Sequence, residues 1–316
     1  MSDDIATVTA AGRCDAQVIF AASAADNCAG ASIECVPPSG SHFARGSTVV
    51  VCTATDAAGN TSECSFSVTV NDVELPVISC PADLIMNTQT GRCDAVAAFA
   101  ATATDNCSAL PVTCVPPSGS TFPKGTNTVN CIARDPSGNN SSCAFRVIVQ
   151  DREPPVLTCP ANFVTNSAPG RCDAIVSFAP IASDNCAGIT VVCTPPSGSA
   201  FAVGATVVSC VATDASGNTN RCSFAVTVQD PEKPVIACPA NILTVTEPGR
   251  CDAQVTFSAN ASDNCAVASV TCTPASGTRF SKGTTAVVCT ARDSSGNEEG
   301  CSFNVTVNDS EPPAIT

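Results

Sequence analysis

Cysteine and carboxylate side chains carry the chemistry available to this 316-residue sequence. Its 23 cysteines could form disulfides or hold metal clusters. Zinc sites favour short Cys-x-x-Cys pairs, often with histidine, but no such pair occurs and His42 is the single histidine. The cytosol keeps thiols reduced, so this density predicts disulfides in an oxidising, extracellular setting, for a secreted or cell-surface protein.

Both kinds of residue recur with a period of 79 residues, which indicates four copies of one module. Three motifs show the period: Arg-Cys-Asp-Ala from Arg13, Asp-Asn-Cys from Asp26 and Asp-x-x-Gly-Asn from Asp56. Short proline-containing segments separate the copies and favour stiff joints. The predicted modules span residues 1–72, 73–151, 152–230 and 231–309, with 310–316 starting a further repeat or forming a linker strand.

Charge and composition exclude several functions. Twenty-eight acids against 14 bases give a net charge of −14, which argues against nucleic acid and anionic membranes and favours metal cations as partners. The sequence contains no apolar run of about 18 residues, so membrane insertion is not predicted. It also contains no secretory signal, so we expect a mature form or a fragment.

The sequence offers few residues that could perform catalysis. A Ser-His-Asp or Cys-His mechanism needs histidine, which the last three modules lack. Paired carboxylates could serve a glycosidase, but the sequence has no tryptophan or tyrosine to stack a sugar. The same lack weakens a lectin function, and His42 is expected to be an ordinary surface residue. We therefore predict that the chain is not an enzyme.

The elements that position these side chains are strands. Phe66, Val68 and Val70 alternate with small polar residues, as in a half-buried strand. The segment 48–54 is predicted to be the preceding strand, joined to it by a hairpin turn at 56–60. Phenylalanines equivalent to Phe20, Phe43 and Phe66 are predicted core residues. The fold class is thus all-β, with four tandem immunoglobulin-like β-sandwich modules in an elongated rod.

Together, the motifs Gly-Arg-Cys, Asp-Asn-Cys, Pro-Pro-Ser-Gly-Ser-x-Phe-x-x-Gly, Thr-Asp-x-x-Gly-Asn and Cys-Ser-Phe-x-Val-x-Val resemble the hyalin repeat, or HYR domain, over essentially the whole chain. The resemblance implies a relative of immunoglobulin or fibronectin type III domains, found in extracellular arrays and linked with cell adhesion.

Six cysteines in each of the last three modules allow fifteen pairings, and the first module has five cysteines because Met1 stands 79 residues before Cys80. Topology places Cys80 and Cys143 at one end of a sandwich, and members with two cysteines keep this pair. Members with four cysteines imply Cys93–Cys107, which leaves Cys114–Cys131.

Carried to every module, the scheme pairs Cys80 with Cys143, Cys93 with Cys107, Cys114 with Cys131, Cys159 with Cys222, Cys172 with Cys186, Cys193 with Cys210, Cys238 with Cys301, Cys251 with Cys265, Cys272 with Cys289, Cys14 with Cys28 and Cys35 with Cys52. It leaves Cys64 as a free thiol, which an intermolecular bond could use.

Five acids recur in every module, at the positions of Asp15, Asp26, Asp56, Asp72 and Glu74. The Asp15 series is expected to form local salt bridges or turns. Because the last strand of each module runs into the linker, the linker acids should meet two acidic loops of the next module. Calcium, which takes six to eight oxygen ligands, would neutralise such a cluster. The alternatives are ordinary turn-forming aspartates and solvated acidic linkers.

The arrangement is similar to the linker calcium sites of cadherin-like arrays. The predicted metal ligands are Asp72, Glu74, Asp105 and Asp135 at the first joint, Asp151, Glu153, Asp184 and Asp214 at the second, and Asp230, Glu232, Asp263 and Asp293 at the third.

The ends raise two alternatives. The first module lacks a leading strand of the 76–79 type, whereas residues 312–316 supply a spare one. Strand addition could then join chains head to tail, or the chain is a segment of a longer periodic protein. We predict a structural or adhesive extracellular segment of a stalk, matrix or filament, which self-associates or binds a protein or surface glycan. A specific receptor- or glycan-binding module and a non-catalytic appendage of a secreted enzyme are the alternatives.

Overall fold

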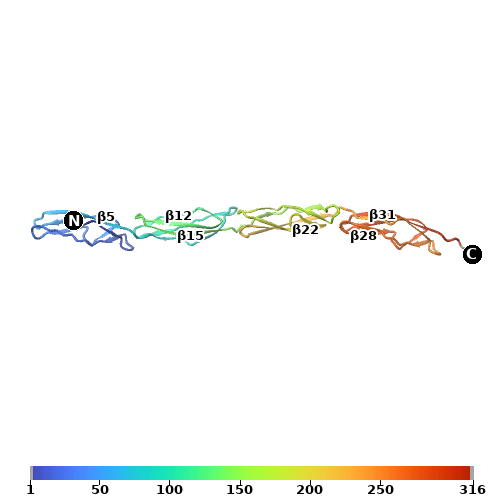
Figure 1. The fold of residues 1–316 in the computed structure, drawn as a ribbon, viewed down its shortest axis with the longest axis horizontal. Coiled ribbons are helices and arrows are strands. Elements are labelled where there is room, and N and C mark those ends of the chain that lie inside the picture. Colours follow the sequence, from blue (N-terminus) through green and yellow to red (C-terminus); the bar gives the residue numbers. More distant parts are fainter. Residues whose placement is uncertain (1–2, 314–316) are drawn as a thin grey trace. The chain divides into compact units, whose positions relative to one another are not determined.

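The computed structural model describes residues 3–313, and its ribbon consists of strands and loops alone (Figure 1). Among these residues, no helix has the length and apolar character that crossing a lipid bilayer requires. The chain divides into two compact units, residues 1–153 and 154–316, and each unit contains two modules. The expected all-β fold of four tandem immunoglobulin-like sandwiches is confirmed.

The strands repeat from module to module. The first module contains β1 Ile5–Val8, β2 Asp15–Gln17, β3 Ser32–Val36, β4 His42–Ala44, β5 Gly46–Thr55 and β6 Thr61–Asn71. The second contains β7 Val77–Ser79, β8 Leu84–Asn87, β9 Asp94–Val96, β10 Thr102–Thr104, β11 Ala109–Leu110, β12 Val112–Val115, β13 Thr121–Pro123, β14 Gly125–Arg134 and β15 Asn140–Gln150.

The second unit follows the same plan. The third module contains β16 Val156–Thr158, β17 Phe163–Asn166, β18 Asp173–Val176, β19 Ile181–Ser183, β20 Thr190–Thr194, β21 Ser199–Ala202, β22 Gly204–Thr213 and β23 Thr219–Gln229. The fourth contains β24 Val235–Ala237, β25 Ile242–Val245, β26 Asp252–Gln254, β27 Asn260–Ser262, β28 Val267–Thr273, β29 Arg279–Ser281, β30 Gly283–Asp293 and β31 Glu298–Asn308.

Each module packs a four-stranded sheet against short paired strands, which in the second module include the three-stranded sheet β11-β10-β7. In the first module the sheet order is β1-β6-β5-β3, with β1 parallel to β6 and the other pairs antiparallel. The strands β2 and β4 pair on the opposite layer. The two long strands β5 and β6 run between the two ends of the module, and those ends carry the loops discussed below.

The core forms from the alternating residues that the sequence singles out. Phe66, Val68 and Val70 of β6 are 5%, 0% and 1% exposed, because every second side chain of a strand faces the same side of its sheet. Phe43 of the facing layer is 2% exposed. Phe20 is partly buried and meets Phe66 edge to face, with ring centroids 5.0 Å apart. The three predicted core phenylalanine positions are therefore confirmed.

The hairpin turn between β5 and β6 is also confirmed. Asp56 Oδ1 accepts hydrogen bonds from the backbone N–H groups of Ala58 (2.9 Å) and Asn60 (2.8 Å). Gly59 has a φ of +90°, which favours glycine at that position. The turn lies at the end of the module opposite to the β4–β5 corner.

A leading strand is present in three modules. β7, β16 and β24 pair with β10, β19 and β27 respectively. Within the described residues of the first module, residues 23–25 stand at the repeat position of β10, but they form no strand and pair with none. The spare strand expected at 312–316 lies largely outside the described residues, since 314–316 are not described, and Met1 lies outside them too.

Candidate functional site at the module junctions

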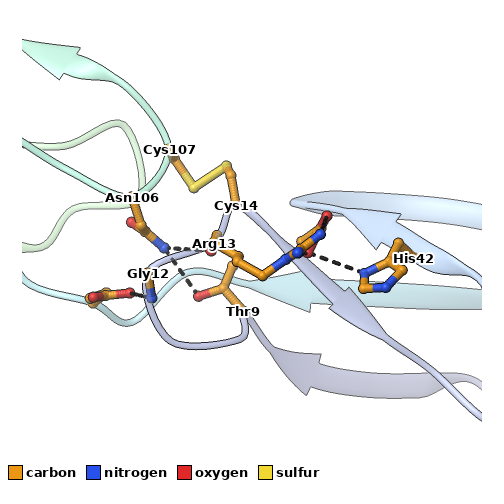
Figure 2. Close-up of polar contacts among 9 residues, drawn as sticks. Thr9, Gly12, Arg13, Cys14, His42, Asn106 and Cys107 are labelled. Carbon is orange, nitrogen blue, oxygen red and sulfur yellow. Dashed lines mark hydrogen bonds and ion pairs between the residues drawn. A yellow bond between two sulfur atoms is a disulfide. The ribbon is translucent and has the colours of Figure 1, made fainter.

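A disulfide joins consecutive modules in each unit. In the first unit Cys14, in the turn between β1 and β2, bonds Cys107, in the loop between β10 and β11 of the next module (Figure 2). In the second unit Cys172 bonds Cys265. Both disulfides span 93 residues of sequence. Each junction in these units therefore has two covalent connections, the peptide linker and a disulfide.

These bonds correct the expected pairing within modules. Cys107 does not bond Cys93, Cys265 does not bond Cys251, Cys14 does not bond Cys28, and Cys172 does not bond Cys186. Within a module the two positions lie at opposite ends of the long hairpin. The carbonyl oxygen of Cys14 accepts the N–H of Arg45, just before β5, whereas Asp26 lines a hollow with the turn after β5. Ten strand residues separate these ends by about 30 Å, and a disulfide needs Cα atoms within about 7 Å.

The other bonds stay within modules. The bonded pairs are Cys35–Cys52, Cys80–Cys143, Cys114–Cys131, Cys159–Cys222, Cys193–Cys210, Cys238–Cys301 and Cys272–Cys289. Cys93 and Cys186 are disulfide-bonded as well. The free cysteines among the described residues are Cys28, Cys64 and Cys251, and all three are exposed. Two thiols expected to be bonded, Cys28 and Cys251, are thus free in the structure.

An asparagine beside each bonded cysteine ties the modules together. Asn106 Nδ2 donates to the carbonyl oxygen of Arg13 at 2.8 Å and approaches Thr9 Oγ1 at 3.5 Å (Figure 2). Asn264 Nδ2 donates to the carbonyl oxygen of Arg171 at 2.9 Å. These asparagines were not among the predicted site residues. Their recurrence within every Asp-Asn-Cys motif was the available signal.

Carboxylate and amide oxygens gather beside the first disulfide. Asp72 is 6% exposed, and its oxygens receive only long contacts, of 3.2–3.5 Å, from neighbouring donors. Oδ1 of Asp105 and Oδ1 of Asn106 are buried and make no hydrogen bond. The carboxylates of Asp72 and Asp105 lie within 4.8 Å of each other. Burying such oxygens without donors is costly, so the cluster has the character of a cation site.

The junction of the second unit repeats this cluster. Asp230 is 6% exposed, and Oδ1 of Asp263 and Oδ1 of Asn264 are buried without hydrogen bonds. The Asp230 and Asp263 carboxylates again lie within 4.8 Å of each other. Ser167 takes the place of Thr9, and its buried hydroxyl also makes no hydrogen bond. Cys107 and Cys265 lie close to the two clusters, but a disulfide sulfur cannot act as a thiolate ligand.

The linker glutamates Glu74 and Glu232 are not part of the carboxylate clusters at their junctions. Glu74 Oε2 accepts the N–H of Gly12 at 3.0 Å, and so closes the turn that carries Cys14 (Figure 2). Gly91, Gly170 and Gly249 make the same bond to Glu153, Glu232 and Glu311. Each glutamate therefore holds the linker against the turn of its own module.

The turn aspartates are also engaged elsewhere. Burial of Asp135 opposes its ionisation, but hydrogen bonds from the Asn139 side chain and from the backbone N–H groups of Asn139, Gly138 and Ser137 outweigh burial and lower the pKa. The pKa values of Asp214 and Asp293 are lowered for the same reasons. Asn139 contacts the junction instead, because its Nδ2 donates to the carbonyl oxygen of Asp72 at 3.2 Å.

The remaining predicted ligands lie in separate units. Asp151, with a fully buried side chain, lies 3.7 Å from Lys124 Nζ. Asp184 Oδ2 accepts the N–H of Cys186 at 3.0 Å, in the same turn that Asp105 and Asp263 make.

The residue just before the first long strand varies between modules and is basic in three of them. Lys124 lies 3.7 Å from Asp151, and Lys282 lies 3.1 Å from Asp309. Arg45 Nη1 donates to Ser137 Oγ at 2.6 Å in the first junction. The equivalent residue of the third module is Val203. The Asp230 cluster therefore lacks, among the described residues, the ammonium group that lies beside Asp151 and Asp309.

The Asp15 series forms local ion pairs, as expected. Arg13 Nε donates to Asp15 Oδ1 at 2.7 Å, and this bond is the main reason that the pKa of Asp15 falls to about 2. The equivalent pairs are Arg92–Asp94, Arg171–Asp173 and Arg250–Asp252. His42 is exposed, with Nδ1 3.3 Å from Asp15 Oδ1 (Figure 2).

Fold and junctions define a tandem β-sandwich repeat protein in which a disulfide bonds the two modules of each unit. The HYR domain matches residues 1–70, 71–149, 150–228 and 229–307. The chain therefore belongs to the HYR domain family, and the expected family is confirmed.

The relatives include two proteins named hyalin. The hyalin of Strongylocentrotus purpuratus is 34% identical over 87% of this chain and 24% of its own length. The hyalin of Lytechinus variegatus is 32% identical over 87% of this chain and 55% of its own length. The chain thus spans about a quarter and about half of these two relatives. Among solved structures, extracellular domains 1–5 of protocadherin gamma B2 align over 99% of this chain and 80% of theirs, at 17% identity and a TM-score of 0.35.

Proposed function

We propose that this chain is a structural segment of an extracellular adhesive or matrix protein, in which the modules act as stiff spacers and the partners are proteins of the same kind. The disulfide content supports an extracellular setting. In this proposal the chain performs no catalysis.

The junction disulfide is the observation that supports a spacer. A linker alone would let two modules reorient, but Cys14–Cys107 adds a second attachment on the other module. The Asn106–Arg13 hydrogen bond lies beside it. Since two separated attachments oppose both bending and twisting, the junction resists reorientation.

Small-angle scattering of the full oxidised chain tests this stiffness. Replacing both junction disulfides, as C14S/C107S/C172S/C265S, should broaden the distribution of interatomic distances. The matched control, C35S/C52S/C193S/C210S, removes two disulfides within modules and should leave the distribution of intermodule distances unchanged. Equal profiles for both variants and the unmodified chain would contradict the stiff-spacer function.

Calcium is the second part of the proposal. At the Asp230 cluster, the two carboxylates and the amide oxygen of Asn264 offer buried oxygens, two of which have no hydrogen-bond donor. These are hard ligands of the type that calcium binds. When bound, calcium would neutralise the carboxylates and hold the linker of one module to the loop of the next. Asp230 and Asp263 would be its charged ligands, and Asp72 and Asp105 the equivalents in the first unit.

Calorimetric titration of the chelator-treated chain with calcium measures this binding. The variant V203K should place an ammonium beside Asp230, as Lys124 lies beside Asp151. This charge should abolish calcium binding at that junction, so that the chain binds one calcium ion fewer. V203M is the matched control, with a similar length and no charge. An absence of calcium binding by the unmodified chain, or equal binding by V203K and V203M, would refute this part of the proposal.

A further inference from the structure

The junctions of the two units offer matching oxygens to a cation but differ in one neighbouring side chain. Asp72 and Asp230 are both 6% exposed, and each carboxylate lies within 4.8 Å of the carboxylate of its loop aspartate. The residue just before the first long strand is Arg45 in the first unit and Val203 in the second. Because the carboxylates repeat, the two junctions compare one site that has a nearby cation with one that has none at this position.

Arg45 reaches across the first junction toward Asp72. Its Nη1 donates to Ser137 Oγ at 2.6 Å, and Ser137 Oγ lies 3.5 Å from Asp72 Oδ2. The guanidinium therefore lies within about 6 Å of the carboxylate, with one hydroxyl between them. In the second unit, Ser295 holds the repeat position of Ser137 and donates to Asp230 Oδ2 at 3.3 Å. Within the described part of the chain, no lysine or arginine side chain hydrogen-bonds Ser295.

The charge of Arg45 partly replaces that of a bound ion. Because an arginine side chain stays charged at ordinary pH, its guanidinium always offsets part of the negative charge of Asp72. The same charge repels an incoming cation. For a divalent ion about 7 Å from the guanidinium, this repulsion lowers the affinity about tenfold even at the dielectric constant of water. The first junction thus needs calcium less, and binds it more weakly, than the junction of the second unit.

A buried hydroxyl at each junction shows the same difference. Thr9 Oγ1 contacts Asp72 Oδ1 at 3.4 Å and Asn106 Nδ2 at 3.5 Å. Ser167, at the repeat position of Thr9, is 8% exposed, and its hydroxyl makes no hydrogen bond. A buried polar group without a partner is costly, and calcium takes oxygen ligands. The junction of the second unit therefore has one more oxygen that an ion would satisfy.

We propose that Arg45 serves as the built-in cation of the first junction, and that of these two junctions only the Asp230 cluster binds calcium with high affinity. This inference rests on the calcium part of the function proposed above and deepens it, because it assigns the ion to one of the two junctions. The first junction then needs no ion, whereas the junction of the second unit gains rigidity when calcium binds. One chain thereby contains a joint of constant stiffness and a joint whose stiffness follows the calcium concentration.

Calorimetric titration of the chelator-treated full chain with calcium, at low ionic strength, tests the assignment. D230N should lose one tight site relative to the unmodified chain, whereas D72N should lose none. R45M keeps the length of the side chain and removes its charge, so it should gain a site that binds about tenfold more tightly than the first junction of the unmodified chain. R45K keeps the charge and should resemble the unmodified chain. R146M is the matched control, because it removes the same charge from β15, where Arg146 pairs with Asp83.

The calcium measurements separate this inference from the function on which it rests. If D72N and D230N each lose a tight site, this inference fails and the calcium part of the proposed function stands. If no variant binds calcium, both fail. Equal numbers of tight sites in R45M and R146M, or no loss of a site in D230N, would also overturn the inference.

Hydrogen exchange in the presence of chelator gives a readout that needs no calcium. Cys107 N–H donates to Asp105 Oδ2 at 3.2 Å beside the first junction, and Cys265 N–H makes the equivalent bond at 2.8 Å in the second unit. R45M should speed exchange at Cys107 about tenfold, because the repulsion between Asp72 and Asp105 is no longer offset, and should leave Cys265 unchanged. Unchanged exchange at Cys107 in R45M would contradict the role of Arg45 as a cation.

Discussion

Removing the junction disulfide of the first unit should destabilise the second module specifically. The variant C14S/C107S deletes the bond between Cys14 and Cys107 and keeps the peptide linker and the Cys80–Cys143 and Cys114–Cys131 disulfides of the second module. When the second module unfolds while the first stays folded, the disulfide restrains the unfolded segment between Asp72 and Cys107. The variant loses that restraint on the unfolded state.

The magnitude follows from the length of that segment. A closed loop of roughly 35 residues lowers the unfolded-chain entropy by an amount worth about 3.8 kcal/mol at 25 °C. The hairpin disulfide Cys114–Cys131, with a separation of 17 residues, is worth about 3.1 kcal/mol by the same relation. Deleting the junction disulfide should therefore cost at least as much as deleting the hairpin disulfide.

Hydrogen exchange read by mass spectrometry provides the assay. The slowest amides of β14 and β15 report unfolding of the second module, and a loss of about 3.8 kcal/mol should speed their exchange about 500-fold. Amides of β30 and β31 in the fourth module provide an internal reference that should not change. C114S/C131S serves as the matched control.

A change of less than about tenfold in β14 and β15 would refute this account of the junction. So would an equal acceleration in β30 and β31, because the bond would then act on the whole chain rather than on one module. Peptide mapping that finds Cys14 bonded to Cys28 in the unmodified protein would contradict the pairing itself.

Three further predictions concern single side chains. Phe201→Ala should destabilise the third module by about 3–5 kcal/mol, because it removes a ring that is only 2% exposed. Denaturant unfolding measures this loss, and a loss below about 1 kcal/mol would contradict the assignment of Phe201 to the core. The lowered pKa of Asp214 means that its stabilising effect is present above its ordinary pKa of 3.8 and is lost as pH falls through the lower folded value. Asp214→Asn should therefore flatten the acid-induced loss of stability, and an unchanged pH dependence would argue against it. Glu232→Ala should speed amide exchange at Gly170 at a cost of less than about 1 kcal/mol, and unchanged exchange would refute the turn-closing role.

The strand framework could be predicted from the sequence because its signals are local. Alternation at Phe66, Val68 and Val70 reflects the two-residue period of a strand, whatever its distant partners. The Asp56 turn depends on hydrogen bonds within five residues. Both features repeat in every module.

The junction pairing could not be predicted in the same way, because the period of the sequence hides it. A bond from Cys14 to Cys28 and a bond from Cys14 to Cys107 join the same two repeat positions, one within a copy and one between copies. Only the length of β5, which sets the two positions about 30 Å apart within a module, separates the two cases. The length of the strand therefore decides between the two disulfide pairings, whereas the spacing of the motifs does not.

The sequence predicted the place of the linker aspartate at the junction but not the direction of the linker glutamate. The continuation of β6 into the linker brings Asp72 to the Asp105 loop. Glu74 has a longer side chain, and the turn made by its N–H to Asp72 Oδ1 directs it back to Gly12. That direction depends on side-chain hydrogen bonds, which spacing does not reveal.

The bond between Cys14 and Cys107 also changes what a peptidase can achieve. A single cut in the exposed loops anywhere between these two residues opens the backbone, yet both fragments remain joined through sulfur. Two cleavages, or one cleavage together with a reductant, are needed before a piece is released. A protein built in this way can be nicked in a hostile environment and remain one molecule.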